Sequence, residues 1–397
     1  MPDARRPLHP ETLAIRQQVA RSPEREHAVP LFLTSSFVFD DAEQARALFA
    51  DELPGNIYSR YSNPNTDEFV AKLVALEGAE DGIATASGMA AVFVSLAALV
   101  SAGQHIVASR AVFGSTHQIL TKLLPRFGVT HTYVDADAPA EAWSAAITPA
   151  TRAVFLESPS NPGLAVVDIA AVAQAAHAKG VPVLVDNCFA TPVLQQPIAL
   201  GADLVIHSAT KWIDGQGRTL GGAIVGRRDL VAECRFVARH TGPALSPFNA
   251  WVLSKSLETL ALRMERHCAN AQHLAEHFAA HAELEAVRYP FLPSHPQAAL
   301  ARRQMSAGGG IVVLVVRGGY ERARRFLDAL ELLSHSPNLG DARTIVTHPA
   351  STTHAKLTEA ERQAVGIVPG LIRISVGLEH VGDIIADIEQ ALARSAG

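Results

Sequence analysis

Short apolar runs alternate with longer segments of helical spacing through the first two thirds of the chain. The runs are typical of strands buried on both faces. They lie at 104–109, 129–134, 152–157, 181–186, 203–207 and 220–226. The helical segments between them include 87–101, 115–126 and 168–179. Because strands that alternate with helices are joined by right-handed crossovers, the pattern predicts an α/β fold with a mostly parallel sheet and helices on both of its faces.

The same pattern divides the chain into three predicted parts. Residues 1–60 are richer in arginine, proline and glutamate, and we expect an N-terminal arm that contacts a neighbouring subunit. Residues 61–256 hold the alternating elements of a cofactor-binding domain. A long helical stretch that begins near Pro247 leads into a smaller C-terminal α/β domain at 257–397. The expected elements of that domain are a strand near 311–317 and a helix over 380–394.

The composition narrows the class of protein. The chain has 397 residues, of which 48% are hydrophobic and 18% charged, as in globular enzymes. Its net charge of −5 gives no indication of a nucleic-acid or membrane partner. No apolar run approaches a transmembrane span and Met1–Arg6 begins no signal segment, so we expect a cytoplasmic protein. Cys188, Cys234 and Cys268 lack the spacing of a metal site, and we expect Cys188 to be buried as a small hydrophobic residue.

One segment carries most of the chemical information. The apolar residues 204–206 lead into His207-Ser-Ala-Thr-Lys211, which a glycine-rich loop follows. A lysine that acts as a nucleophile must be held near-neutral in a partly dry site, and a phosphate beside it needs hydroxyl and amide donors. Ser208 and Thr210 precede Lys211 and meet the second need. The segment therefore suggests pyridoxal 5′-phosphate, with Lys211 on its aldehyde and the hydroxyls on its phosphate.

Other interpretations of this segment exist. Ser208 to Lys211 also fits the S-x-x-K pattern of penicillin-recognising serine hydrolases, but the chain lacks their S-D-N and K-T-G segments. Gly215, Gly217 and Gly221 approximate a dinucleotide fingerprint, but their spacing is wrong and they open no helix. The third interpretation is an ordinary exposed lysine at the end of a strand.

Two further segments favour the cofactor. Asp186 ends the apolar run 181–186, where its carboxylate could pair with a protonated pyridine nitrogen, although an acid in this position is more often a helix N-cap. The turn Ser87-Gly88-Met89 opens an apolar stretch, and the unpaired amides of a helix N-terminus are a natural seat for a phosphate. An ordinary N-cap has the same pattern. The convergence of three segments on one phosphorylated aldehyde favours the cofactor.

Taken together, these segments resemble the Cys/Met-metabolism family of pyridoxal-phosphate enzymes. The similarity runs from about residue 30 to the C-terminus. Besides the segments above, the matching stretches are 31–36, 55–64, 112–116, 157–162 and 371–379. The resemblance implies a fold-type I pyridoxal-phosphate transferase. The Asp-Gly-Gln-Gly-Arg sequence at 214–218 is closer to the sulfhydrylase branch of the family than to its lyases.

The resemblance also implies which residues hold the cofactor. Lys211 would bind the aldehyde and then shuttle protons, while Asp186 would pair with the pyridine nitrogen. Tyr58 and Arg60 would reach the phosphate of the neighbouring subunit, so a complete site would need a dimer; the family suggests a homotetramer. The remaining phosphate-binding residues would be Ser87, Gly88, Met89, Ser208 and Thr210.

The resemblance implies a second set of residues, which would bind the substrate. Arg373 would clamp the α-carboxylate, and Asn338 would help to hold it. Asn161 would lie near the 3-oxygen of the cofactor and the amino acid. Phe113 stands where most of the family has a tyrosine that stacks on the pyridine ring. Phenylalanine keeps the flat face but has no phenol to protonate a leaving group. Carboxylates leave readily without protonation, so Phe113 favours an acylated homoserine as the substrate.

The expected reaction is γ-replacement in methionine biosynthesis, in which O-succinyl-L-homoserine and sulfide give L-homocysteine and succinate. Arg110 and Arg218 are candidates for binding the second carboxylate of the succinyl group. The alternatives within the family are a cystathionine γ-synthase or lyase and an O-acetylhomoserine sulfhydrylase. Outside it, the alternative is a catalytically silent binding protein on the same scaffold.

The histidines show no complete metal site. His273, His277 and His281 recur at helical spacing, but no cysteine or carboxylate cluster accompanies them, so we expect a solvated helix face and no bound metal. The C-terminal loops carry three more histidines, one of which could line the substrate entrance. These are His335, His348 and His354.

Overall fold

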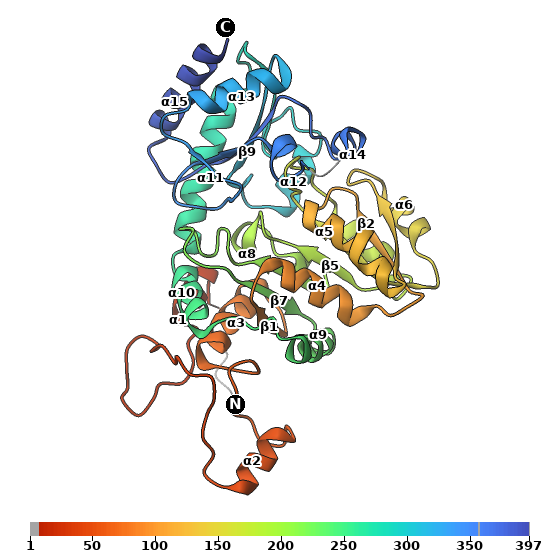
Figure 1. The fold of residues 1–397 in the computed structure, drawn as a ribbon, viewed down its shortest axis with the longest axis vertical. Helices are drawn as coiled ribbons and strands as arrows, with labels where there is room; N and C mark the ends of the chain where they lie inside the picture. The colour runs from red at the N-terminus through yellow and green to blue at the C-terminus, as the bar shows by residue number, and fades with distance from the viewer. Residues whose placement is uncertain (1–7, 356–357, 397) are drawn as a thin grey trace.

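Two β-sheets organise the chain in the computed structural model, which describes residues 8–355 and 358–396. Helix α11 (Leu260–Phe278) packs on α8 (Thr191–Leu194) beside the first sheet and on strands of the second (Figure 1). Over these residues, no helix is both long and apolar enough to cross a membrane.

The large sheet has seven strands in the order β1-β7-β6-β5-β4-β2-β3. Strand β7 runs opposite to the other six strands of this sheet, so the prediction of a mostly parallel sheet is confirmed. The strands are β1 (Asp81–Thr85), β2 (His105–Ser109), β3 (Thr130–Val134), β4 (Thr151–Glu157), β5 (Val183–Asp186), β6 (Leu204–Ser208) and β7 (Gly222–Gly226). Sequence patterning missed β1, a short edge strand with two glycine or alanine positions and no apolar run.

Both faces of this sheet are buried, and alternate residues of each strand point to opposite sides. In β4, Val154 and Leu156 join one hydrophobic cluster, whereas Ala153 and Phe155 join the other. The first cluster includes side chains of α3 (Pro64–Glu77), α6 (Ala140–Ala146), α7 (Ile169–His177) and α10 (Pro247–Leu257). The second includes α4 (Gly88–Leu99) and α9 (Arg228–Thr241). Each fully buried aliphatic or aromatic side chain contributes about 1.5–3 kcal/mol, so burial on both faces holds the strand ends in place.

Two predicted helices differ from the observed elements. The segment 115–126 is not one helix but α5 (Gly114–Gln118), a π-helical turn at 119–123 and a 3-10 turn at 124–127. Pro125 explains the change, because proline lacks an amide proton and its ring clashes with the preceding turn of an α-helix. The long helix from Pro247 is interrupted after Leu257, and α11 begins at Leu260.

The second sheet has five strands in the order β10-β11-β12-β9-β8. Its pairs are antiparallel except β10–β11. The strands are β8 (Leu284–Arg288), β9 (Ile311–Val316), β10 (Ser334–His335), β11 (Ile345–Thr347) and β12 (Leu371–Ser375). The helices of this part are α12 (Ala298–Gln304), α13 (Gly319–Ala329), α14 (Glu359–Ala364) and α15 (Val381–Ser395). Side chains of α13 and α15 close the hydrophobic core of this sheet. The predicted elements near 311–317 and 380–394 correspond to β9 and α15.

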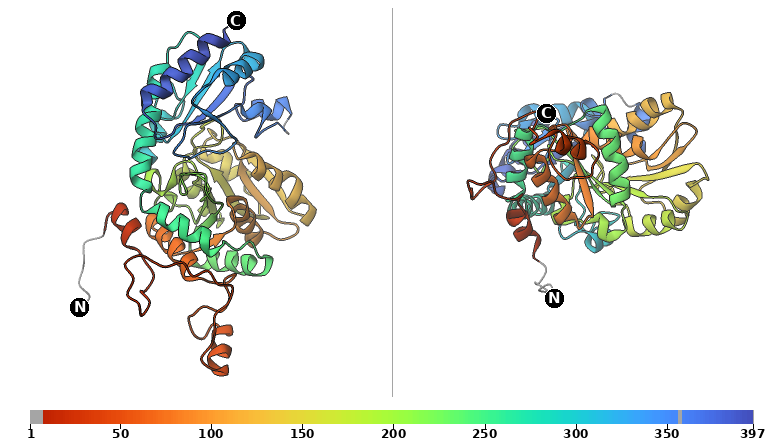
Figure 2. Two further views of the ribbon diagram at one scale, coloured as in Figure 1. Left: turned by 60° about the vertical axis from the view of Figure 1, so that its left-hand side comes forward. Right: turned by 90° about the horizontal axis from the view of Figure 1, so that it is seen from below.

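The N-terminal segment extends from this body. Helix α1 (Pro10–Arg16) packs on α3, whereas α2 (Ala42–Phe49) stands away from both sheets (Figures 1 and 2). Several large apolar side chains of this segment face solvent in the single chain, among them Leu33 at 70% and Val38 at 98% exposure. That this arm contacts a neighbouring subunit stays a prediction, as do the three domain boundaries.

Candidate active site

Three neighbouring strands of the large sheet end in polar side chains at one edge. Glu157 ends β4, Asp186 ends β5 and Ser208 ends β6. The parallel register of β4 and β5 pairs Glu157 with Asp186. Lys211 follows β6 within one turn, where its amide donates to the Ser208 carbonyl at 3.2 Å. Open α/β sheets bind ligands at this edge, outside the carboxyl ends of the strands.

The small domain completes the site from the opposite side. Nζ of Lys211 donates a hydrogen bond to Oδ1 of Asn338 at 2.6 Å. Arg373, in β12, donates from Nη1 to Oδ1 of Asn161 and from Nη2 to the Asn338 carbonyl, both at 2.9 Å. Arg373 is 1% exposed, and within the described residues its Nε has no partner and its guanidinium forms no ion pair. A buried guanidinium without a counter-ion is well suited to an anionic ligand.

Helix α4 begins directly against β6. Ser87 is its N-cap, and the hydroxyl accepts from the Ala90 amide at 3.1 Å. A Cβ added to Gly88 would lie 2.5 Å from Cβ of Ser208, closer than real contacts allow. The missing side chain at Gly88 therefore lets the first amides of α4 approach the Ser208 hydroxyl. These amides have no intrahelical acceptors and attract an anion.

The same groups line a cavity of about 210 Å³. Of the residues predicted from sequence, the cavity is lined by Ser87, Gly88, Met89, Phe113, Asn161, Asp186, Ser208, Thr210, Lys211 and Arg373. Asn338 reaches Lys211 from the loop whose neighbouring residues Pro337 and Leu339 also line the cavity. The other lining residues received no site role from the sequence: Val92, Glu157, Cys188, Phe189 and Leu220. Glu157 shares the signal that selected Asp186, since both acids end apolar strands.

Two predicted residues lie elsewhere. Tyr58 is 42% exposed. The guanidinium of Arg60 lies 4.8 Å from the ring centre of Tyr61 and donates to the carbonyl of Arg239. Neither Tyr58 nor Arg60 lines the cavity of its own chain. Their assignment to the site of a neighbouring subunit stays a prediction.

Burial shifts the protonation of the central groups. Desolvation, with the nearby Arg373 charge, lowers the pKa of Lys211, so its amine loses a proton more readily. Desolvation raises the pKa of Asp186 to about 6. Burial and the adjacent Asp186 raise the pKa of Glu157 as well. Desolvation and the adjacent Asp186 raise the pKa of the Cys188 thiol, so this thiol stays protonated. Cys188 was predicted to be buried, but it is only half-buried and lines the cavity.

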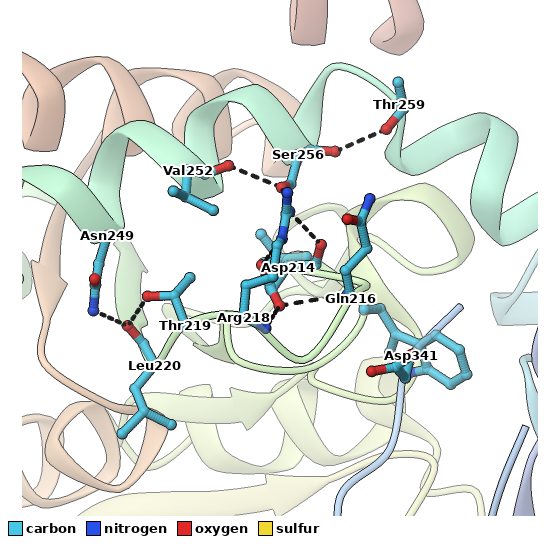
Figure 3. Close-up of polar contacts among 12 residues, drawn as sticks. Asp214, Gln216, Arg218, Thr219, Leu220, Asn249, Val252, Ser256, Thr259 and Asp341 are labelled. Carbon is cyan, nitrogen blue, oxygen red and sulfur yellow. Dashed lines mark hydrogen bonds and ion pairs between the residues drawn. The ribbon is translucent and has the colours of Figure 1, made fainter. Parts of the chain in front are cut away.

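Hydrogen bonds to neighbouring helices hold the loop after Lys211, and Figure 3 shows its contacts with α10. Asp214 is fully buried and accepts from the amide and Nε of Arg218 at 2.7 and 3.1 Å. Nη2 of Arg218 donates to the Ser256 hydroxyl on α10 at 2.5 Å. Arg263 of α11 donates to the carbonyls of Trp212 and Ile213 at 2.5 and 3.0 Å. The turn that carries Lys211 is therefore fixed to two helices.

The structure places both candidates for the succinyl carboxylate outside the cavity. Arg218 is committed to Asp214 and Ser256, and Arg110 pairs with Asp135 at 2.6 Å. Neither arginine lines the cavity. The sequence placed both beside cofactor segments, but adjacency in sequence does not fix the direction of a side chain.

The histidines singled out in the sequence lie outside the cavity lining. Helix α11 ends at Phe278, so His281 lies beyond it and the predicted shared helix face is wrong for this residue. His277 and His281 instead contact Glu389 of α15 at 2.8 and 3.4 Å. His335 is exposed on β10, and His348 bonds to the Pro369 carbonyl at 2.8 Å. His354 is buried with its ring edge-on to Phe113 at 6.5 Å, outside the cavity lining. Over the described ranges, no cluster of three or more potential metal ligands occurs.

The fold and the cavity define a class. An amine beyond one strand, an acid ending the neighbouring strand and a helix N-terminus beside them form the site of a pyridoxal-phosphate-dependent enzyme. The cofactor fits these residues: Gly88 leaves the seat open, and Lys211 and Asp186 line the same cavity.

The particular family follows from comparison with known proteins. The chain belongs to the Cys/Met metabolism PLP-dependent enzymes, whose family model matches residues 11–393. It is 51% identical to an O-succinylhomoserine sulfhydrylase from Pseudomonas aeruginosa over 96% of this chain and 95% of that protein. It is 45% identical to an L-methionine gamma-lyase from Pseudomonas putida over 92% of each chain.

A solved structure shows the same fold. A candidate O-acetylhomoserine (thiol)-lyase from Campylobacter jejuni has a TM-score of 0.94 and 35% identity, covering 97% of this chain and all of that one. That structure carries N′-pyridoxyl-lysine-5′-monophosphate at its position 205. The present chain is accordingly an enzyme whose cofactor is pyridoxal 5′-phosphate.

Proposed function

We propose that this enzyme replaces the γ-substituent of O-succinyl-L-homoserine with sulfide, giving L-homocysteine and succinate for methionine biosynthesis. The observation that carries the proposal is a single cavity lined by Lys211, Asp186 and Arg373. It combines a proton-transfer group, a partner for the cofactor and an anchor for an amino-acid carboxylate. The 51% identity to an O-succinylhomoserine sulfhydrylase supports the same reaction.

The cofactor would be held by residues already described. Lys211 would bind its aldehyde and Asp186 its ring nitrogen, while the amides of Gly88 and Met89 would donate to its phosphate. The other phosphate donors would be the hydroxyls of Ser208 and Thr210. When bound, pyridoxal phosphate withdraws electrons from the amino-acid Cα and so acidifies the protons on Cα and Cβ.

The side chains would then divide the work. Arg373 would bind the α-carboxylate through a guanidinium already oriented by Asn161 and Asn338. The amine of Lys211, with its pKa lowered by burial, would remove the Cα proton and return it. Loss of a Cβ proton accompanies departure of succinate from Cγ. Hydrosulfide then forms the new Cγ–S bond, and the two protons go back to Cβ and Cα.

The residue at position 113 supports an ester substrate. Phe113 lines the cavity and has no hydroxyl to donate a proton. Succinate leaves as a carboxylate that is stable at neutral pH and needs no acid. A thiolate leaving group, as in cystathionine or methionine, benefits more from protonation. In the described residues, Lys211 and Arg373 are the cations that line the cavity, so a cation for the succinyl carboxylate would come from the neighbouring subunit.

The test is a product assay with two esters and two sulfur donors. O-succinyl- and O-acetylhomoserine are each offered with sulfide or cysteine, and L-methionine is offered alone. We expect homocysteine from the succinyl ester and sulfide at the highest kcat/KM. Preference for the acetyl ester, cystathionine as the main product, or 2-oxobutanoate from methionine would each overturn the assignment. Borohydride treatment followed by peptide mass analysis should locate the cofactor on Lys211.

We propose further that the enzyme is a homotetramer in which Tyr58 and Arg60 serve the partner's site. The exposed apolar arm and the placement of both residues outside their own cavity support this. Lys211→Ala and Arg60→Ala variants should each be inactive alone. If sites are shared, unfolding and refolding them together should restore activity, because hybrid dimers contain one intact site. No recovery in verified hybrids would contradict the shared site.

A further inference from the structure

A buried carboxyl group borders the proposed cofactor site but has no part in the roles assigned above. Glu157 is 4% exposed, lines the cavity and lies in register with Asp186 on the neighbouring strand. In the described part of the chain it forms no ion pair with a cation. Hydrogen bonds are therefore the polar contacts that hold this side chain, and their donors show which parts of the site it connects.

The two oxygens of Glu157 accept hydrogen bonds from two different loops. Oε2 accepts from the backbone amide of Phe113 at 2.6 Å, and Oε1 accepts from the backbone amide of Asn161 at 2.9 Å. Phe113 lies in the loop after β2, whereas Asn161 lies in the loop after β4. Both residues line the cavity. The two donors oppose the rise in the pKa of Glu157 that burial and Asp186 cause, because hydrogen bonds from amides favour the charged form. Whatever its protonation, this one side chain connects the two loops through both of its oxygens.

The connection continues to the proposed substrate anchor. Oδ1 of Asn161 accepts from Nη1 of Arg373 at 2.9 Å, so the position of the guanidinium depends on Asn161. A single chain of hydrogen bonds thus runs from the backbone of Phe113 through Glu157 and Asn161 to Arg373.

We propose that Glu157 is a positioning residue, whose two carboxylate oxygens fix Phe113 and Asn161 relative to Asp186 and thereby set the geometry of both the cofactor ring and the Arg373 anchor. The inference rests on the proposed function, since it takes the cavity as the cofactor and amino-acid site. A carboxylate is needed because both of its oxygens accept hydrogen bonds. Glutamine has the same shape but presents an NH₂ group to one of the two amide donors.

The test compares Glu157→Gln with Glu68→Gln in the holoenzyme. Glu68 is 1% exposed and accepts from Ser254 and Lys72 on the side of α3 and α10, remote from the cavity lining. It matches Glu157 in burial and in the chemical change. The readouts are the dissociation constant of pyridoxal phosphate, the visible circular dichroism of the bound cofactor, and KM and kcat separately.

For Glu157→Gln we expect about tenfold weaker cofactor binding, because one of the two buried amide donors loses its acceptor. The visible dichroism should weaken as the ring is held less firmly, and KM for the amino acid should rise about tenfold through Arg373. Glu68→Gln should lower thermal stability and leave these readouts unchanged. Values for Glu157→Gln within twofold of the wild type, or equal changes in both variants, would overturn the proposal.

If Glu157→Gln does not fold, Glu157→Asp replaces it. Aspartate keeps both acceptor oxygens but withdraws them by one methylene, so the same readouts should change in the same direction and by less. An unchanged Asp variant would overturn the proposal. Cofactor affinity and dichroism do not depend on which ester or sulfur donor is used. A failure of the proposed reaction is therefore distinguishable from a failure of this inference.

Discussion

Nζ of Lys211 lies 2.6 Å from Oδ1 of Asn338, so an amine carried by the large sheet is held by an amide from the small domain. The two loops also meet through their backbones. Gly340 has a φ of +76°, and a Cβ there would lie 2.5 Å from the Trp212 amide nitrogen. Any rearrangement between the two domains would therefore reach the proposed catalytic amine directly.

This contact predicts a shifted pH dependence in Asn338→Asp. Burial holds the pKa of Lys211 below its ordinary value. A carboxylate at position 338 favours the charged ammonium, so the pKa of Lys211 should rise and the free amine should become available only at higher pH. The measurement is the rate of pyridoxal-phosphate capture by cofactor-free protein across pH. Asn249→Asp, on the far side of the loop at Leu220, is the control, and an unmoved midpoint in Asn338→Asp would contradict the prediction.

The close approach of α4 to β6 predicts a specific loss in Gly88→Ala. The new Cβ would meet Cβ of Ser208 at 2.5 Å and its Cα at 2.8 Å, so the helix start must move away from the strand. We expect cofactor affinity to fall at least about tenfold, since displaced amides and hydroxyls no longer converge on one phosphate. Gly114→Ala, whose Cβ would meet its nearest neighbour at 3.4 Å, should bind the cofactor almost normally. Fluorescence titration measures both, and equal affinities would refute the account.

The contacts of Arg218 with Asp214 and Ser256 predict that Arg218→Ala lowers the stability of the protein without changing its substrate preference. Arg218→Ala leaves the fully buried Asp214 without its guanidinium, although 42% exposure of the arginine side chain moderates the effect. We expect a loss of about 1–3 kcal/mol in the free energy of unfolding. Adding Asp214→Asn should recover part of it, because the orphaned charge is removed. The ratio of kcat/KM for succinyl and acetyl esters should stay constant; a selective loss for the succinyl ester would show that Arg218 binds it after all.

The raised pKa of Asp186 predicts a pH-dependent stability in the cofactor-free protein. Its folded pKa of about 6 exceeds the unfolded value of 3.8, so the native state binds more protons between these limits. The contribution of this group to stability must therefore fall as pH rises from about 4 to 6, by about 1–3 kcal/mol. The check is the unfolding free energy of the wild type minus that of Asp186→Asn, which should decrease as pH rises across this range. A difference that is flat with pH, or that grows as pH rises, would refute it.

The sequence by itself determined the elements that bear the chemistry. Runs such as 181–186 and 203–207 are apolar because both faces of their strands are covered, and this alone locates β5 and β6. It follows that Asp186 lies at the carboxyl end of one strand and Lys211 just beyond that of the next, and the segments around them identify the family. Local signals of this kind survive in the fold because each depends on a few consecutive residues.

Tertiary structure decided whatever depends on register and side-chain direction. Glu157 and Asp186 are 29 positions apart in the chain, and only the pairing of β4 with β5 places them side by side. Arg218 follows the lysine closely, yet its hydrogen bond to Ser256 on α10 turns it away from the cavity. The edge strand β1 has no apolar run, and its backbone is held in a strand by antiparallel pairing with β7. The physical reason is common to all three: a contact across the fold is set by packing between distant segments, and no short stretch of sequence encodes it.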